Sequence, residues 1–313
     1  MTRTSLLLDR GFTEHDPGDH HPEAPGRIFA ILDRLEASGL AAECGKIEGR
    51  EATDDEILLA HSDRYLRTVL AEVTGGHGQL STGDTSYGPH SLRVARAAAG
   101  GVLNAVDAVF EGKCANAFCA VRPPGHHATP DRGMGFCLFN NVAIAARHAR
   151  KKHGVERVAI VDWDVHHGNG TQDIFYEDGG VFFFSTHQSP WYPGTGSKDE
   201  TGNGAGRHTT LNAPLPAGSG MKEIGDIFRG PFADRMRDYK PDLVLLSAGF
   251  DSRLGDPLGH FTLTDEDFAT LTEFLLELAD THAGGRLVSV LEGGYNQRGL
   301  AQAVESHVRV LRG

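Results

Sequence analysis

Five short apolar runs constrain the fold of this chain most strongly, because a cluster of polar residues follows each of them. The runs are rich in Val, Phe, Ile, Leu and Ala, and none alternates cleanly between apolar and polar residues. This pattern is typical of strands that are buried on both faces of a parallel sheet. We therefore predict strands at residues 117–121, 158–161, 181–184, 243–246 and 287–291.

Helical patterns lie between these runs. Apolar residues recur at three- and four-residue spacing in segments 92–110, 140–153 and 268–283, and Thr264 is a suitable N-cap for the last of them. Strands that alternate with helices favour a doubly wound α/β fold. The predicted fold class is α/β, with a single, mostly parallel sheet that carries helices on both faces.

The length of 313 residues fits one large α/β domain, and we expect it to span residues 1–313 because no linker separates two halves. A hydrophobic fraction of 39% together with 40 glycines is typical of a loop-rich enzyme. No apolar stretch approaches the ~20 residues of a membrane span, and the amino-terminal segment does not resemble a signal peptide.

Charge and cysteine content narrow the functional class further. The net charge of −12 disfavours tight binding to nucleic acid, although an acidic surface can steer a cationic substrate. The four cysteines form no CxxC pair, which favours reduced thiols. We therefore expect a cytoplasmic protein without a nucleic-acid or membrane partner.

The polar clusters follow the strand-like runs, and ligands in doubly wound folds bind beyond the carboxyl ends of the strands. We therefore expect the clusters to meet in one site. They comprise residues 122–127, 162–167, 185–187, Asp251 and residues 292–295.

The cluster that begins at Asp162 is suited to binding a cation. In an extended chain Asp162, Asp164 and His166 point to one side, because side chains alternate with a period of two. Asp164 and His166 offer two ligands, and Asp251 is the natural third. One nitrogen and two oxygens suit Zn²⁺, while Fe²⁺, Co²⁺ and Mn²⁺ remain alternatives. Taken singly, each residue is explained better as a hydrogen-bonded loop anchor.

Two adjacent histidines, His126 and His127, are candidates for proton transfer. A carboxylate partner favours a charged imidazole, whereas an amide partner leaves it neutral. If Asp162 orients His126 and Asn169 orients His127, then His127 is the better general base and His126 the better electrostatic helper. The alternative is that one of the pair only packs against the turn that the two preceding prolines impose.

Tyr295 follows Gly293 and Gly294, which let the backbone turn sharply and approach a ligand closely. A phenol at this position can donate a hydrogen bond to an oxyanion that forms on a carbonyl. The competing explanation is that Tyr295 packs at the base of its loop. Beside a metal and two histidines, it completes the parts needed for metal-assisted hydrolysis of an amide.

Aromatic residues in glycine-bounded loops can form the walls of a narrow slot for an aliphatic chain. Phe136 follows Gly135, and Tyr192 precedes a Pro-Gly-Thr-Gly segment. Ordinary packing in the core or at the surface is the alternative. The long loops at 188–206 and 11–26 are expected to form the rim of the site.

These motifs, in this order, resemble those of the zinc-dependent histone deacetylase superfamily. Within this superfamily the motif sequences are most similar to those of class II deacetylases, bacterial deacetylase-like amidohydrolases and acetylpolyamine amidohydrolases. The likeness covers essentially the whole chain. It rests on the segments HPEAPGR, RPPGHHA, MGFCLFNN, VDWDVHHGNGTQ, WYPGTG, SAGFDSRLGDPLG and LEGGY.

The resemblance implies an arginase/deacetylase-like fold and one catalytic zinc ion. The implied zinc ligands are Asp164, His166 and Asp251. His127 would act as general base and then as general acid with the help of His126, while Tyr295 would polarise the acyl carbonyl. The family also carries a structural K⁺, and here its ligands would be oxygens of Asp162, Asp164, His166, Ser185 and Thr186. A second K⁺ is implied near Phe175, Asp178 and Val181.

The resemblance also implies how substrate binds. Phe136 and Tyr192 would flank an acyl-lysine tunnel, and Gly135 would accept a contact from the substrate amide. Leu258 stands where polyamine-selective relatives carry an acidic residue, which favours acyl-lysine over acetylpolyamines. Because the chain is too compact for the long loop insertion with which polyamine-selective relatives dimerise, we expect a monomer or a small homo-oligomer.

We therefore expect a zinc-dependent amidohydrolase that removes acetyl or short acyl groups from lysine side chains in proteins or peptides. Three alternatives remain. An acetylpolyamine amidohydrolase would share all of this machinery. An arginase-like dimanganese enzyme would need a D-x-H-x-D motif, which D-x-D-x-H-H replaces here. A non-catalytic acyl-lysine binding module is opposed by His126, His127 and Tyr295.

Overall fold

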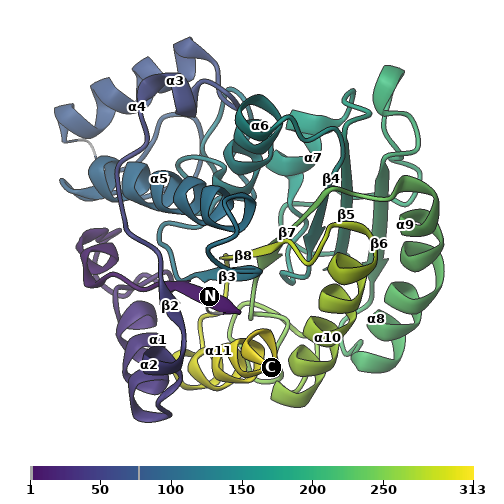
Figure 1. Ribbon diagram of the computed structural model, residues 1–313. Coiled ribbons are helices and arrows are strands. Elements are labelled where there is room, and N and C mark those ends of the chain that lie inside the picture. Colours follow the sequence, from purple (N-terminus) through teal and green to yellow (C-terminus); the bar gives the residue numbers. More distant parts are fainter. Residues whose placement is uncertain (1–2, 77) are drawn as a thin grey trace.

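The computed structural model describes residues 3–76 and 78–313. In these residues eight strands form one sheet in the order β2-β1-β3-β8-β7-β4-β5-β6, and every neighbouring pair is parallel (Figure 1). The predicted fold class is thus confirmed. The strands are β1 (Thr4–Leu7), β2 (Gly45–Lys46), β3 (Asn116–Cys119), β4 (Val158–Asp162), β5 (Val181–Gln188), β6 (Thr210–Leu215), β7 (Leu243–Ala248) and β8 (Leu287–Leu291).

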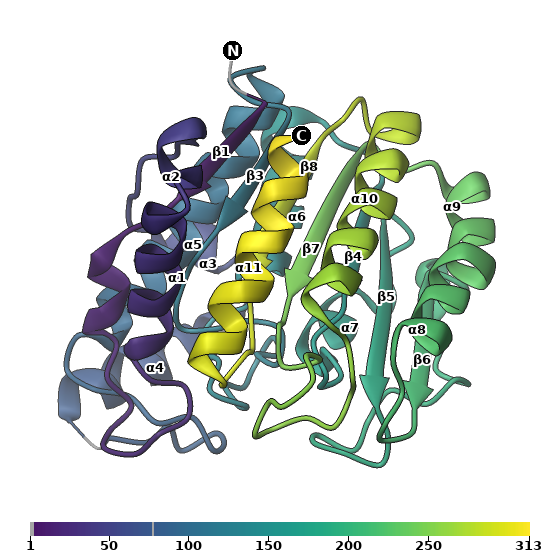
Figure 2. The ribbon, with the colours of Figure 1, turned by 90° about the horizontal axis from the view of Figure 1, so that it is seen from below.

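Helices cover both faces of this sheet, as Figure 2 shows. One face carries α1 (Gly26–Ala37), α2 (Leu40–Glu43), α8 (Met221–Ile227), α9 (Ala233–Tyr239), α10 (Asp265–His282) and α11 (Gln297–Arg312). The other face carries α3 (Asp54–Ile57), α4 (Asp63–Gly75), α5 (Ser91–Phe110), α6 (Asn141–His153) and α7 (Asn169–Phe175). Short 3₁₀ or π turns lie at Arg10–Glu14, Gly204–Gly206 and Phe228–Phe232.

All five predicted strands are present; β8 has the predicted bounds, and the other four have shifted ends. Strand β3 ends at Cys119 rather than at residue 121, and β5 continues to Gln188, so residues 185–187 lie within the strand rather than beyond it. The strands β1, β2 and β6 were not predicted. Strand β2 is only two residues long, and β6 contains Asn212 and Pro214, so neither shows an apolar run.

The predicted helices also form, and side-chain caps explain where two of them begin. Thr264 caps α10 through a reciprocal capping box with Asp267, so this helix begins earlier than the predicted residue 268. Asn140 caps α6 by accepting a hydrogen bond from the Ala143 amide at 3.0 Å. Both caps place the helix ends beside the loops that carry the polar clusters.

Strands β4, β7 and β8 are buried along their whole length, as expected for a parallel sheet covered on both faces. The five predicted strands are consecutive neighbours in the sheet, in the order β3-β8-β7-β4-β5. Asp162 at the end of β4 lies level with Ser185 of β5 and Ser247 of β7. The polar clusters therefore emerge side by side at one edge of the sheet.

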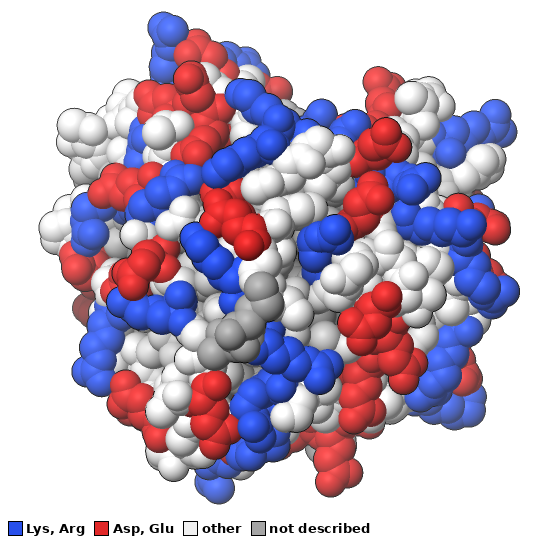
Figure 3. All heavy atoms as spheres, in the orientation of Figure 1, with Lys and Arg blue, Asp and Glu red and all other residues white. Residues whose placement is uncertain are grey.

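The face of the molecule in Figure 3 carries lysine and arginine side chains interspersed with aspartate and glutamate. Among the described residues, no helix has both the length and the apolar content that crossing a membrane would require.

Candidate metal and catalytic site

Asp164, His166 and Asp251 converge beyond the ends of β4 and β7, and all three are buried. The Nδ1 atom of His166 lies 2.9 Å from Asp164 Oδ1 and 3.2 Å from Asp251 Oδ2. One possible ligand atom from each residue lies within 4.8 Å of the other two. The three residues named from the sequence are therefore close enough to share one ion.

The chemistry of this group fits a divalent cation. Asp251 Oδ2 is buried and makes no hydrogen bond of acceptable geometry among the described residues, although His166 Nδ1 is near. Burial and the neighbouring Asp164 carboxylate raise the pKa of Asp251 to about 7. Burial lowers the pKa of His166, but its two carboxylate neighbours outweigh burial and raise it to about 10. A cation would neutralise the same carboxylates and satisfy the unpaired oxygen.

Glycines make room for this group. A Cβ atom on Gly293 would lie 1.9 Å from Asp251 Oδ2, and one on Gly249 would lie 2.1 Å from Asp164 Oδ2. Both distances are far below van der Waals contact, so any side chain at either position would displace a carboxylate. The close approach of β8 and β7 to the carboxylates therefore depends on the missing side chains.

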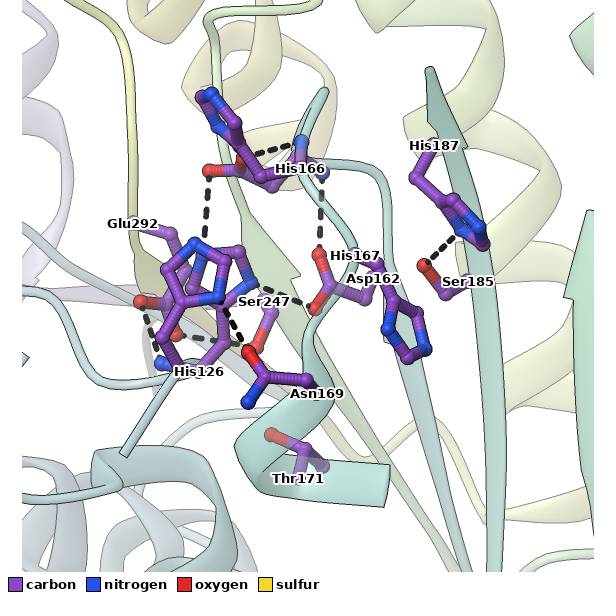
Figure 4. A network of polar contacts seen from close by, with 12 residues as sticks. His126, Asp162, His166, His167, Asn169, Thr171, Ser185, His187, Ser247 and Glu292 are labelled. Atoms are coloured by element: carbon purple, nitrogen blue, oxygen red, sulfur yellow. Dashed lines mark hydrogen bonds and ion pairs between the residues drawn. The ribbon is translucent and has the colours of Figure 1, made fainter. Parts of the chain in front are cut away.

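His126 is paired with a carboxylate. Its Nδ1–H donates to Asp162 Oδ2 at 2.9 Å, and its backbone N–H donates to Glu292 Oε2 at 3.1 Å (Figure 4). Burial lowers the pKa of His126, but the carboxylates of Asp162, Asp164 and Glu292 outweigh burial and hold this pKa well above its ordinary value. His126 is therefore suited to carry a positive charge.

His127 is paired with an amide. Its Nδ1–H donates to Asn169 Oδ1 at 2.8 Å, and its ring centroid lies 4.0 Å from that of His126. Burial, and then the positive charges of His126 and His166, hold the pKa of His127 well below its ordinary value. The ring is thus neutral, with its proton on Nδ1 and a free lone pair on Nε2.

A cavity of about 220 Å³ opens above these residues. Tyr295 forms part of its wall, with its ring centroid 6.0 Å from that of Phe136 and the Arg27 guanidinium 5.1 Å from its own. The lining includes every residue expected from the sequence to contact substrate. The full set is Asp84, His127, Gly135, Phe136, His166, Trp191, Tyr192, Leu258 and Tyr295.

The sequence reasoning assigned no role to three parts of the site. Asp84 is exposed at the cavity and accepts a hydrogen bond from the Gly135 amide at 2.7 Å, but no motif marks it. Trp191 lies in the noticed segment WYPGTG, and its Nε1–H donates to the Leu258 carbonyl at 2.8 Å. Glu292 lies in LEGGY, and its carboxylate accepts hydrogen bonds from the Gly125 and His126 amides.

A fourth group without an assigned role supports the loop that carries Tyr295. Glu23 is buried between Arg27 and Arg122 and forms ion pairs with both. Arg27 also donates to the Gly294 carbonyl at 2.7 Å, next to Tyr295. The segments HPEAPGR and RPPGHHA contain all of these charges, so the signal was present but carried no indication of their contact.

The residues expected around K⁺ are partly arranged as a cation site. Asp162 and Ser185 are cross-strand neighbours, and the hydroxyl of Thr186 is buried without a hydrogen-bond partner among the described residues. At the second expected position, Arg147 and Arg150 bind the Asp178 carboxylate at 3.1 and 2.7 Å. Because this carboxylate is already paired, backbone oxygens would have to supply the ligands of a second K⁺.

Comparisons with known proteins agree with this geometry. A family model described as "Histone deacetylase domain" matches residues 21–311. A histone deacetylase-like amidohydrolase of Pseudomonas aeruginosa is 38% identical over 92% of this chain and 76% of its own length. The polyamine deacetylase HDAC10 of Homo sapiens is 41% identical over 100% of this chain but only 47% of its own. The crystal structure of the HDA15 HD domain superposes with a TM-score of 0.95 at 36% identity, covering 100% of this chain and 90% of that one.

Proposed function

Because this chain belongs to the histone deacetylase family, whose members are hydrolases acting on amides, we propose that it is a zinc-dependent lysine deacylase. Its substrates would be proteins or peptides that carry acetyl or other short acyl groups on the lysine side-chain nitrogen. The observation that carries the proposal is the convergence of Asp164, His166 and Asp251 beside a cavity lined by His127 and Tyr295.

A zinc ion held by Asp164, His166 and Asp251 would lower the pKa of a water molecule and polarise the acyl carbonyl. His127, neutral and with Nε2 unprotonated, accepts the proton of the attacking water and later delivers it to the leaving amine. The Asn169 amide oxygen accepts a hydrogen bond from His127 Nδ1–H. This bond holds the ring proton on Nδ1 and so favours the tautomer in which Nε2 is unprotonated. His126 stays charged beside Asp162 and stabilises the negative charge that develops nearby.

Tyr295 supplies a neutral hydrogen-bond donor. Burial first, and then the Asp251 carboxylate, hold the pKa of its phenol well above the ordinary value, so the proton is retained. The hydroxyl donates to the substrate carbonyl oxygen as this oxygen becomes an anion. Arg27 holds the loop by its bond to the Gly294 carbonyl.

The cavity would hold the aliphatic part of acyl-lysine. Phe136 and Tyr192 form apolar walls, and Leu258 adds a third apolar surface. Among the described residues the Gly135 carbonyl receives only a weak contact, from the Cys137 thiol at 3.3 Å, which leaves it free to accept the substrate amide N–H. A structural K⁺ bound by Asp162, Asp164, His166, Ser185 and Thr186 completes the proposal.

An assay with a fluorogenic acetyl-lysine peptide tests the activity. We expect turnover to disappear on treatment with a chelator and to return with Zn²⁺. Parallel additions of Fe²⁺, Co²⁺ and Mn²⁺ show how much turnover each of these metals restores. The isosteric variant Asp251→Asn should purify without zinc and stay inactive, because the site loses an anionic ligand. Full activity of the metal-free chain, or normal zinc content in the variant, would refute the proposal.

Deacetylation of polyamines is the second candidate, since the human relative is named a polyamine deacetylase. Leu258 opposes it, because an apolar wall offers nothing to the second ammonium group of a polyamine. We expect the wild type to prefer an acetyl-lysine peptide over acetylspermidine. Leu258→Glu should shift this preference at least about tenfold towards acetylspermidine through one new charge pair.

Leu254→Glu is the matched control for that substitution, because Leu254 is 57% exposed and does not line the cavity. It adds the same charge to the same loop without changing the wall, so its preference should equal that of the wild type. A wild type that hydrolyses acetylspermidine faster than the peptide would establish the polyamine alternative instead.

A further inference from the structure

A second group of side chains of the types that bind metals lies away from the cavity. Asp107 belongs to the last turn of α5, and His148 and His153 belong to the second half of α6. Both helices end just before the strands that follow them, so this group lies at the amino edge of the sheet. The cavity and its residues lie at the carboxyl edge. The proposed deacylation assigns no role to this second group.

The three side chains meet at one carboxylate. The Nε2 atoms of His148 and His153 lie 2.8 and 2.7 Å from the same oxygen, Asp107 Oδ1. One possible ligand atom from each residue lies within 4.8 Å of the others. The second oxygen, Oδ2, forms an ion pair with Lys152 Nζ at 2.7 Å.

The two imidazoles are held in place by their surroundings. His148 is buried between the helices, and the His153 ring stacks on Phe110 with centroids 4.6 Å apart and planes 12° apart. The Arg286 guanidinium lies 4.9 Å from the Phe110 ring centroid and extends this stack. Ligands fixed in this way lose little conformational entropy when an ion binds.

We propose that Asp107, His148 and His153 form a second divalent-cation site, suited to Zn²⁺. Two imidazole nitrogens and one carboxylate oxygen make a common zinc ligand set, with the fourth position open to water. In a tetrahedron with bonds of about 2.0 Å, neighbouring ligand atoms are about 3.3 Å apart, so the ligands must separate by roughly half an ångström. Side chains of Asp107 and His153 are each 14% exposed, which gives the ion a route from solvent.

Lys152 is the competitor for this site. Its ammonium group must leave Asp107, or at least move, before a dication can bind. The Lys152 side chain is 49% exposed, and a solvated ion pair of this kind is weak. The same contacts would also suit a purely hydrogen-bonded cluster; the two explanations differ in whether the chain takes up a second ion.

The position of the site indicates what an ion would do there. An ion shared by α5 and α6 would cross-link the two ends of segment 111–140, which contains His126 and His127. Because the ion binds the folded chain and not the unfolded one, it would raise stability without taking part in hydrolysis.

Zinc uptake by the folded enzyme tests the proposal. The zinc-loaded wild type is dialysed against increasing Zn²⁺, and bound zinc per chain is measured together with the melting temperature. We expect a second equivalent in the wild type and only one in His153→Phe, which keeps the stacked ring but removes the ligand. Lys152→Met should bind the second ion about fivefold or more tightly, because it removes a competing charge.

His90→Phe is the matched control, since His90 is exposed at the start of α5 and outside the group. It should take up two zinc ions, and deacylation by both histidine variants should equal that of the wild type. Wild type that binds one zinc ion at every concentration, or His153→Phe that still binds two, overturns the proposal. Unchanged zinc affinity in Lys152→Met would also overturn the proposal.

Discussion

At the residue scale, two neighbouring imidazoles are held in opposite charge states because their partners differ. His126 donates to the Asp162 carboxylate, which stabilises the imidazolium form. His127 donates to the Asn169 amide, which offers no net charge and leaves the neutral ring favoured. Adjacent positions in the chain thus acquire the two properties that acid–base catalysis needs, a fixed positive charge and a free lone pair.

Removing one hydroxyl tests the role of Tyr295. Tyr295→Phe keeps the ring that packs against Phe136 and Arg27, but it can no longer donate to the oxyanion. Loss of one such donor typically reduces turnover about 10²- to 10³-fold. We expect this loss in the peptide assay at unchanged zinc content. Turnover equal to that of the wild type would show that the phenol only packs in the cavity wall.

At the element scale, the buried side chain of His307 connects two helices and a strand. His307 of α11 lies 2.7 Å from the Thr272 hydroxyl of α10 and 2.9 Å from the Ser289 hydroxyl of β8. Burial lowers the pKa of His307 to about 3. The folded chain therefore requires a neutral ring at this position, whereas the unfolded chain leaves it free to become protonated.

This difference makes stability depend on pH. The contribution is complete above the unfolded pKa of 6.5 and is lost as the pH falls from there towards 3, where the folded ring also becomes protonated. At pH 5 the loss from this residue is about 2 kcal/mol. We expect urea unfolding of His307→Asn to show a smaller difference between pH 7 and pH 5 than the wild type. His90→Asn should keep the wild-type difference, and equal differences in all three proteins would contradict the assignment.

At the scale of the whole molecule, the site draws on the exits of four neighbouring strands, β3, β8, β7 and β4, and on rim loops from elsewhere in the chain. No single strand and its loop carry the metal ligands, the histidines and the tyrosine together, so the site requires at least these four strands to pair. We propose that residues 1–313 behave as one domain.

One unfolding transition is the expected consequence of that arrangement. Trp163 is 1% exposed in the core and Trp191 is 36% exposed at the cavity rim, so tryptophan fluorescence reports on both regions. In the zinc-loaded protein, fluorescence and far-ultraviolet circular dichroism should follow the same melting curve. Separate curves would show that part of the chain unfolds independently.

The sequence alone determined the features that depend on neighbouring residues. Apolar runs identified five neighbouring strands, four of which carry the site, and Thr264 was identified as the N-cap of α10. The types and spacing of Asp164, His166 and the two adjacent histidines indicated metal and proton chemistry. These features are local because an apolar run and a helix cap each consist of residues close in the chain.

Only the tertiary structure decided which distant residues meet. The strand order placed Asp251 beside Asp164, and it placed the Glu292 carboxylate beneath the backbone of His126. The same order brought Glu23 against Arg122 across 99 residues of chain. Asp84 and the edge strand β6 left no apolar or motif signal, because their positions are imposed by the neighbours they pack against. Long-range contacts follow from packing the whole sheet, and no local pattern encodes that packing.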